Sequence, residues 1–123
     1  MPTDIEIEAE IQAKGLTAPR ITPTDIESAI SQEYYFRADD GVFGANTERG
    51  QFPVSLPELP TSLALLTLCI LVLKNGFTIV GISAYVSPEN FDAELGRKIA
   101  RQNAVDQIWP LEGYHLRSQL AAA

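Results

Sequence analysis

The chain has 123 residues, 46% hydrophobic and 20% charged, which is typical of one folded domain rather than of a disordered segment. Its 16 acidic and 9 basic residues give a formal charge of −7. That charge disfavours duplex nucleic acid, whose binding draws on Lys and Arg contacts with phosphates. One cysteine and one histidine, Cys69 and His115, exclude an internal disulfide and a soft-ligand zinc set. We expect Cys69 to be a small buried hydrophobe and His115 a surface or interfacial residue.

The longest apolar stretch, 63–73, is much shorter than the roughly twenty residues of a membrane-spanning helix. The N-terminus lacks the basic start and apolar core of a signal peptide. We therefore expect a soluble protein that stays in the cytoplasm where it is made and has no membrane partner.

The start of the chain predicts a short amphipathic helix over 5–14, because Ile7 and Ile11 lie four residues apart and Gly15 offers a stop. Residues 1–20 are expected to form an N-terminal arm that is either flexible or a short helix.

A stronger helix start follows. Thr22 can act as the N-cap and Pro23 suits the first helical position. Apolar side chains then recur every four residues at Ile26, Ile30 and Tyr34, which predicts a helix from about 23 to 36.

The segment 37–61 is rich in glycine and proline with little periodicity, which predicts a long loop. Phe43 and Phe52 either anchor this loop by packing or stack on a ligand, and packing is the favoured interpretation.

A β-hairpin is predicted over about 65–86, because Asn75-Gly76 is the sequence favoured by a two-residue type I′ turn. The strand over 68–73 is apolar on both faces, so its second face must be covered by the terminal helices or by a partner subunit. A two-residue turn implies these facing pairs: Lys74 with Phe77, Val72 with Ile79, Leu71 with Val80, and Cys69 with Ile82.

The next helix is predicted to begin with Ser87 as its cap and Pro88 in its first position. Gly96 within it permits close approach to the sheet, and Trp109-Pro110 predicts a break before a short terminal helix. The expected fold is therefore a single α+β domain over 1–123, with a small antiparallel sheet, an N-terminal helix and C-terminal helices packed on the sheet.

Possible chemistry gathers around this helix. Arg97 and Arg101 lie one turn apart, so their guanidinium groups share a face and can hold a diphosphate or two phosphates. An ordinary solvated face is the favoured alternative from spacing alone. Asn90 can contact a base or ribose edge. Phe91 and Tyr85 can stack on a base, although Phe91 also begins the apolar stripe and is more typical of a core residue.

Three stretches resemble a known family: Leu66-Thr-Leu-Cys-Ile-Leu-Val-Leu-Lys-Asn-Gly-Phe77, Ser87-Pro-Glu-Asn-Phe-Asp-Ala-Glu-Leu-Gly-Arg-Lys-Ile-Ala-Arg101 and Trp109-Pro-Leu-Glu-Gly-Tyr114. They are similar to the small tailed-phage and prophage proteins of the gene 49/gene 66 family, over about 16–120. The segment 37–61 matches least. The apparent layout also resembles the phage Thoeris anti-defence sponge proteins.

The resemblance implies a phage-encoded binding protein without catalytic residues or a cofactor. Such proteins sequester cyclic ADP-ribose-type immune signals, in some cases cyclic oligonucleotides, and assemble as homo-oligomers. Stacking aromatics, an amide and arginines would hold the ligand here. The candidate ligand-binding residues are Phe77, Tyr85, Asn90, Phe91, Arg97 and Arg101.

Two other functions remain open. A phage accessory protein that contacts a host protein would suit the acidic surface and the long loop. A nucleotide-processing enzyme ranks last, because the sequence holds no carboxylate pair with an orienting base, no phosphate-cradling glycine loop and no Ser/His/Asp signature.

Overall fold

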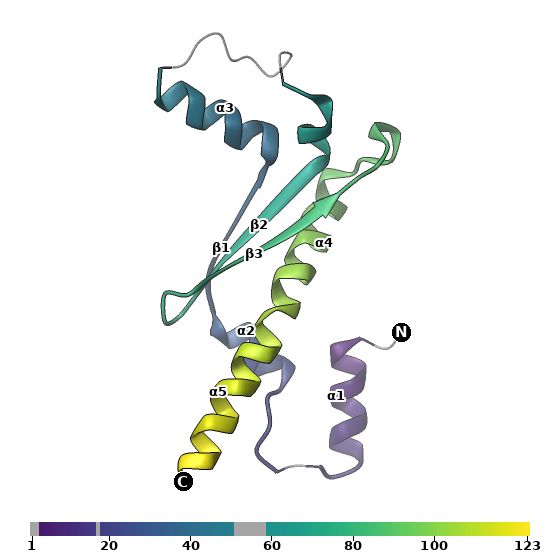
Figure 1. Ribbon diagram of the computed structural model, residues 1–123. Helices are drawn as coiled ribbons and strands as arrows, with labels where there is room; N and C mark the ends of the chain where they lie inside the picture. Colours follow the sequence, from purple (N-terminus) through teal and green to yellow (C-terminus); the bar gives the residue numbers. More distant parts are fainter. Residues whose placement is uncertain (1–2, 17, 51–58) are drawn as a thin grey trace.

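In the computed structural model, which describes residues 3–16, 18–50 and 59–123, a three-stranded antiparallel sheet lies against a long helix (Figure 1). The fold is α+β, as the sequence predicts. The described elements in chain order are α1 (Asp4–Ala13), α2 (Pro23–Ala29), β1 (Ile30–Arg37), α3 (Ala38–Glu48), the 3₁₀ helix η2 (Thr61–Leu65), β2 (Leu66–Leu73), β3 (Thr78–Ala84), the 3₁₀ helix η3 (Pro88–Asn90), α4 (Ala93–Asp106) and α5 (Ile108–Ala122).

The strand β2 is the centre of the sheet and pairs with both neighbours in antiparallel fashion. Leu73 N–H donates to Phe77 O over 2.8 Å, so the turn closed by this pair holds three residues, 74–76, rather than two. Gly76 takes the positive φ of 88° that this turn needs, and no other residue type in the described ranges has a positive φ. Asn75 instead accepts a hydrogen bond from Phe77 N–H through its side chain over 2.9 Å.

The predicted strand register is therefore wrong by one residue. Leu71 faces Ile79, Ile70 faces Val80 and Cys69 faces Gly81. A type I′ turn would require a positive φ at Asn75 as well as at Gly76. The slip is consequential, because it decides which β3 side chains share a face with which β2 side chains.

The core lies between one face of the sheet and α4. Cys69, Leu71 and Ile79 are buried there, with the small residues Ala100 and Ala104 of α4 packed over them. Gly81 permits this close packing. A Cβ at that position would lie 2.1 Å from the Ala100 carbonyl oxygen and 2.7 Å from the Ala104 Cβ. Burial of Cys69 confirms its interpretation as a core hydrophobe.

The side chains of Asn103, on α4, and Gln107, the C-cap residue that follows it, also reach the outer strand β3. Asn103 Nδ2 donates to Ile82 O over 2.7 Å, and Gln107 Nε2 donates to Val80 O over 2.8 Å. These bonds satisfy carbonyl groups on β3, which is an edge strand of the described sheet.

The helix predicted over 23–36 is wrong in its second half. The capping box of Thr22 and Asp25 does start α2, but the helix ends at Ala29 and β1 begins at Ile30. The aromatic run of Tyr34 and Tyr35 suits a strand, and pairing with β2 outweighs the four-residue apolar spacing.

The loop predicted over 37–61 is also wrong in its described parts. Residues Ala38–Glu48 form α3 and Thr61–Leu65 form η2, which contact each other. Gly41 does not break α3. It fits against Phe36, because a Cβ there would lie 2.8 Å from the ring. Phe43 lies on α3 and is partly exposed, whereas Phe52 lies outside the described residues.

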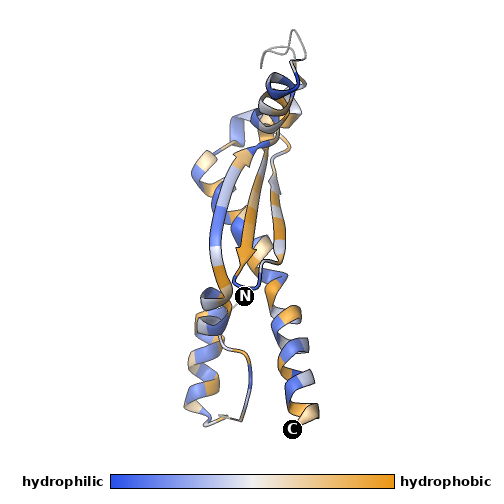
Figure 2. Ribbon diagram, turned by 90° about the vertical axis from the view of Figure 1, so that its left-hand side faces the viewer, coloured by the Kyte–Doolittle hydropathy of each residue, from blue (hydrophilic) through white to orange (hydrophobic). Residues whose placement is uncertain are grey.

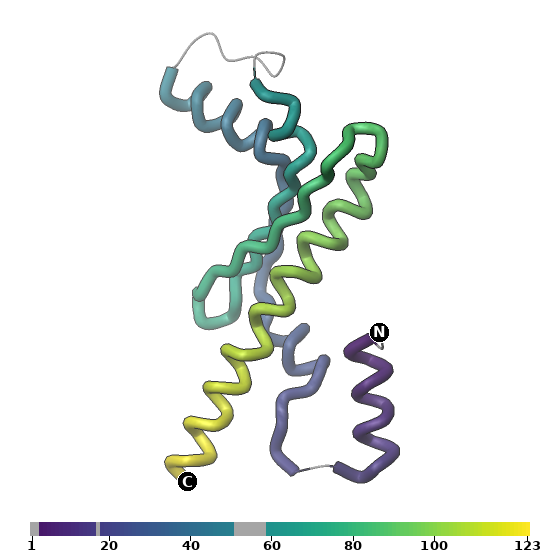
Figure 3. The backbone as a smooth tube through the Cα atoms, turned by 45° about the vertical axis from the view of Figure 1, so that its right-hand side comes forward, coloured from purple at the N-terminus to yellow at the C-terminus, as the bar shows by residue number. Residues whose placement is uncertain are grey.

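The two C-terminal helices follow each other almost without interruption (Figure 3). The predicted break at Trp109 is wrong because Pro110 falls in the first turn of α5, where its missing N–H has no intrahelical partner to lose. The predicted N-cap is wrong too. Ser87 precedes only the short η3, and Asp92 caps α4 by accepting a hydrogen bond from Leu95 N–H over 3.0 Å.

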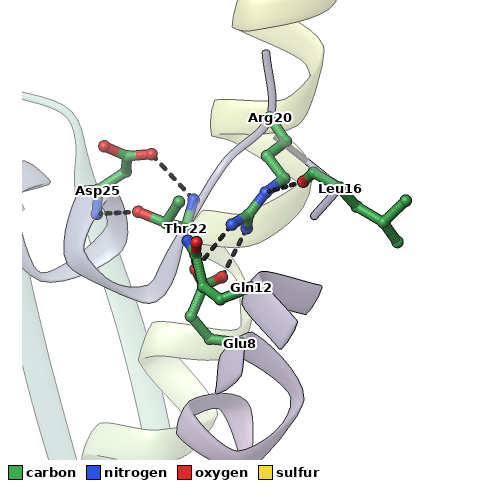
Figure 4. Close-up of polar contacts among 6 residues, drawn as sticks. All are labelled: Glu8, Gln12, Leu16, Arg20, Thr22 and Asp25. Carbon is green, nitrogen blue, oxygen red and sulfur yellow. Dashed lines mark hydrogen bonds and ion pairs between the residues drawn. The ribbon is translucent and has the colours of Figure 1, made fainter. Parts of the chain in front are cut away.

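The N-terminal arm is helical, and the predicted helix corresponds to α1. A capping box of Thr3 and Glu6 starts it. Glu8 pairs with Arg20, whose Nη2 lies 2.7 Å from Glu8 Oε2, and Arg20 Nε also donates to the Leu16 carbonyl (Figure 4). This pair ties α1 to the chain that leads into α2.

In the part of the chain that the structure describes, no helix runs along the other face of the sheet as α4 runs along the first. Along β2 the burial alternates strictly, with half-buried Leu68, Ile70 and Val72 on this second face. Figure 2 shows β2 as an almost continuous hydrophobic band between a more hydrophilic β1 and a mixed β3. We call this second face the open face.

Candidate functional site

The six candidate residues do not gather at one place in a single chain. Phe77 lies at the hairpin turn, before β3. Tyr85, Asn90 and Phe91 follow the opposite end of β3, in the connection to α4 (Figure 1). A strand of seven residues separates the two groups by roughly 23 Å at about 3.3 Å per residue.

The aromatic pair at the start of α4 is well defined. The rings of Tyr85 and Phe91 meet edge to face, with centroids 5.4 Å apart and an interplanar angle of 79°. The Tyr85 hydroxyl donates a long hydrogen bond of 3.4 Å to the Asp92 carbonyl. Both rings are half-buried, while Asn90 beside them is exposed. The arrangement fixes the Phe91 ring against Tyr85 and leaves an amide at the surface next to it.

Phe91 and Arg97 together line a small cavity of about 270 Å³ between the end of β1 and the start of α4. Arg37 lines it from β1, together with Tyr35, Phe36 and Thr67, and the carboxylate of Asp40 lines it from α3. Two guanidinium groups and several aromatic rings therefore face one hollow. This combination can hold an anionic group by planar forks and an aromatic ring by stacking.

The two guanidinium groups of this cavity differ in how they are engaged. Arg37 binds the buried carboxylate of Asp39 in a bidentate manner, at 3.0 and 2.8 Å, and lies 3.6 Å from Asp40. Arg97 is exposed and makes no ion pair with another described residue. Arg97 is thus the cation at this cavity that a ligand could bind without displacing a described carboxylate.

Arg101, the second predicted guanidinium, is held elsewhere. It donates to Glu33 of β1 over 2.7 Å and to both oxygens of Glu27 of α2 over 3.1 and 2.8 Å. These bonds lower the pKa of Glu27 and raise the pKa of Arg101. Arg97 and Arg101 share α4 as the spacing predicts, but a phosphate would have to displace two carboxylates to reach Arg101. Its role in binding stays a prediction.

Phe77 belongs to a larger cavity of about 690 Å³ between the hairpin turn, α2 and α5. Lys74, Asn75, Arg20 and His115 provide its polar lining. Of these, Arg20 is already engaged by Glu8, and His115 lies 3.2 Å from the Gln119 amide nitrogen. This second cavity has a mixed charge, because Asp25 and Glu112 line it as well.

Other kinds of chemistry have little local support. Within 3–16, 18–50 and 59–123, no three His, Cys, Asp or Glu side chains form a group that could hold a metal ion. Burial raises the pKa of the Cys69 thiol, so it is a poor nucleophile in the folded protein. None of the helices in the described part of the chain has the length and apolarity needed to span a bilayer.

Arg37, Tyr35 and Phe36 were not predicted as cavity residues, because the sequence pattern puts them at the end of a helix and the start of a loop. The run Tyr34-Tyr35-Phe36 was the available signal. Three consecutive aromatic residues favour a strand, and a strand at this position brings Arg37 to the start of α4.

The fold and the cavity define a small α+β protein with a hollow where the sheet meets α4, lined by aromatic rings, two arginines and one aspartate. Its family is clear from sequence. Residues 21–120 match the phage protein (N4 Gp49/phage Sf6 gene 66) family, and the chain belongs to that family. Neither a curated protein nor a solved structure matches the chain.

Proposed function

We propose that this phage-family protein binds a cyclic nucleotide-type immune signal, a cyclic ADP-ribose isomer or a cyclic oligonucleotide, and withholds it from host anti-phage defence without converting it. The observation that carries the proposal is the cavity where the exposed Arg97 lies beside the Phe91 ring and the Arg37 guanidinium. Such ligands combine flat bases with phosphates, and this cavity offers partners for both.

The size of the cavity limits what it encloses. Ligand pockets commonly have about 300–1,000 Å³, so a cavity of about 270 Å³ suits one base or one phosphate-bearing part of a cyclic nucleotide. The rest of the ligand would lie outside, across the exposed amide of Asn90 and the edge of Tyr85. A binding protein needs only affinity, so no acid or base is assigned.

The charges also suggest how binding would begin. Arg37 keeps its bonds to Asp39 and so presents a fixed edge, whereas Arg97 is free to turn toward a phosphate. The Arg97 guanidinium would attract an anion to this cavity in a chain of net charge −7, and more weakly as salt rises.

The first experiment is a thermal shift of the purified protein with cyclic ADP-ribose isomers and cyclic di- and trinucleotides. A ligand present at about 100 times its dissociation constant stabilises the native state by about 2.7 kcal/mol, which gives a clear rise in Tm. Heat release and chromatography then show whether the ligand is recovered intact. A new product instead of the original nucleotide would establish an enzyme.

Arg97→Gln tests the site, with Lys98→Gln as the matched control. Lys98 is the adjacent cation on α4 and forms an exposed pair with Glu94 over 3.4 Å. We expect Arg97→Gln to abolish the Tm shift while Lys98→Gln retains it. Equal shifts in both variants would place binding elsewhere. No shift with any nucleotide in the wild-type protein would favour the alternative function, contact with a host protein through the acidic surface.

A further inference from the structure

The larger cavity, of about 690 Å³, lies apart from the Arg97 cavity, and the proposed nucleotide binding does not use it. The hairpin turn, α2 and α5 form its walls. Two of these walls are joined, because Lys74 N–H donates to Ala29 O over 2.9 Å and so ties the turn to the end of α2. The volume of this cavity falls within the range of about 300–1,000 Å³ that is common for small-molecule pockets.

Apolar side chains form much of the lining of this cavity. Leu73 is buried, Ile21 and Leu116 are half-buried, and the ring of Phe77 is 54% exposed. An accessible aromatic ring beside apolar side chains favours a ligand whose body carries a ring, because two rings gain from an offset or edge-to-face contact.

Three of the five titratable side chains that line this cavity are already engaged by the chain itself. Arg20 binds Glu8, with Nη2 and Oε2 2.7 Å apart (Figure 4). The Asp25 carboxylate accepts a hydrogen bond from Thr22 N–H over 2.9 Å, in the capping box of α2. His115 lies 3.2 Å from the amide nitrogen of a glutamine one turn further along α5. A ligand would have to compete with these contacts to use any of the three groups.

Lys74 and Glu112 are the other two titratable side chains, and they bring opposite charges from different walls of the cavity. Lys74 is exposed in the hairpin turn, whereas Glu112 is half-buried in α5. Neither forms an ion pair with another residue in the part of the chain that the structure describes. A half-buried carboxylate without a cation loses part of its hydration, so a ligand that brings an ammonium group would restore a partner to it.

We propose that this cavity binds a free aromatic amino acid, with its ammonium group against Glu112, its carboxylate against Lys74 and its ring against Phe77. A zwitterion satisfies both unpaired charges of the lining, whereas a singly charged molecule satisfies only one. The lysine ammonium stands on a flexible four-carbon stem, so it can move toward a carboxylate that lies close to the ammonium group of the ligand. This site does not depend on nucleotide binding at Arg97.

Isothermal titration calorimetry of the full chain with L-tryptophan tests the proposal, with ligand up to about 5 mM so that millimolar affinity is detected. Three related molecules each lack one feature: tryptamine has no carboxylate, indole-3-propionate has no ammonium group and glycine has no ring. We expect each of them to bind at least about tenfold more weakly than tryptophan, because each leaves one partner of the cavity unused. Failure of tryptophan to bind, or equal binding of any of the other three, overturns the proposal.

Two variants assign the charged partners, and the ligand series on the wild type needs neither of them. In Glu112→Gln, tryptophan should bind about as weakly as indole-3-propionate does to the wild type. In Lys74→Gln, it should bind about as weakly as tryptamine does. The matched controls are Glu94→Gln and Lys98→Gln, which remove the same charges from an exposed pair on α4 that does not line this cavity. Far-UV circular dichroism verifies that each variant is folded. Tryptophan affinity that is unchanged in both folded variants overturns the proposal.

Discussion

The two faces of the β2–β3 hairpin have similar apolar content but very different surroundings. On the covered face, Gly81 and the two alanines of α4 let the helix backbone approach the sheet directly. On the open face, the side chains of Val80 and Ile82, which flank Gly81 along β3, remain about half exposed. The comparison teaches that small residues at the contact, rather than apolar content alone, decide which face of this sheet receives a helix.

The strongest way to break the covered face is Gly81→Val. Because an added Cβ would lie 2.4 Å from the Ala104 backbone nitrogen, α4 must move away from β3. We expect the free energy of unfolding to fall by about 3 kcal/mol or more, measured by urea denaturation. The control is Gly44→Ala in α3, where no atom lies within 4 Å of the new Cβ and the helix should gain up to about 1 kcal/mol. A tolerated Gly81→Val would refute the close packing described here.

Truncation of one side chain on each face sharpens the same comparison. Leu71→Ala removes a fully buried side chain and should cost about 3 kcal/mol. Ile82→Ala removes a half-exposed one and should cost about 1 kcal/mol or less at concentrations where the protein is monomeric. Chemical denaturation at low protein concentration measures both. Equal costs would mean that the open face is as well packed as the core.

The ion pairs of Arg101 clamp α4 to β1 and α2 along the margin of the covered face. Arg101→Gln should cost about 1 kcal/mol, because the three side chains are partly exposed and solvent screens the pairs. Because Arg101 lowers the pKa of Glu27 in the folded protein, the stabilisation from this ion pair depends on pH. It is present above the pKa of Glu27 in the unfolded chain and is lost as pH falls. The free energy of unfolding, measured as a function of pH, should fall less in acid for Arg101→Gln than for the wild type. Identical pH profiles would contradict the role of this pair.

The smallest effect concerns α1, which lies outside both faces. Arg20 holds the pKa of Glu8 at about 2, below its ordinary value of 4.5. The contact should therefore be intact above about pH 4.5 and be lost as pH falls through about 2. Amide hydrogen exchange of α1 should accelerate in that window without global unfolding. Glu8→Gln should show the same faster exchange at neutral pH, whereas Glu10→Gln, in the exposed pair with Lys14, should not.

Local signals in the sequence predicted those parts of the fold that neighbouring residues decide. The capping pattern at Thr22 and the turn residue Gly76 are examples, since their preferences act within a few residues. The path of residues 30–36 was not predictable in the same way. Ile30 and Tyr34 fit an apolar helical stripe, and only pairing with β2, distant in sequence, makes them a strand.

The candidate site shows the same division. Phe91 and Arg97 are both among the six candidates named from the sequence, and they lie close along the chain near the start of α4. It could not add Arg37, whose position depends on strand pairing across the sheet. Nor could it show that Arg101 is engaged by Glu27 and Glu33, since those carboxylates belong to α2 and β1. Spacing along the sequence shows which charged groups share a helix or strand. Tertiary contacts decide which carboxylates pair with each arginine.

The amide side chains of Asn103, on α4, and Gln107, at its C-cap, restrict where a further strand can join the sheet. With Asn103 and Gln107 occupying the Ile82 and Val80 carbonyls, a foreign strand approaching that edge meets acceptors already in use. Among the described residues no strand lies beyond β1, so that edge is the one from which an added β-strand can extend this sheet. Any fibre or strand-exchange product of this protein should therefore begin at Ile30–Arg37.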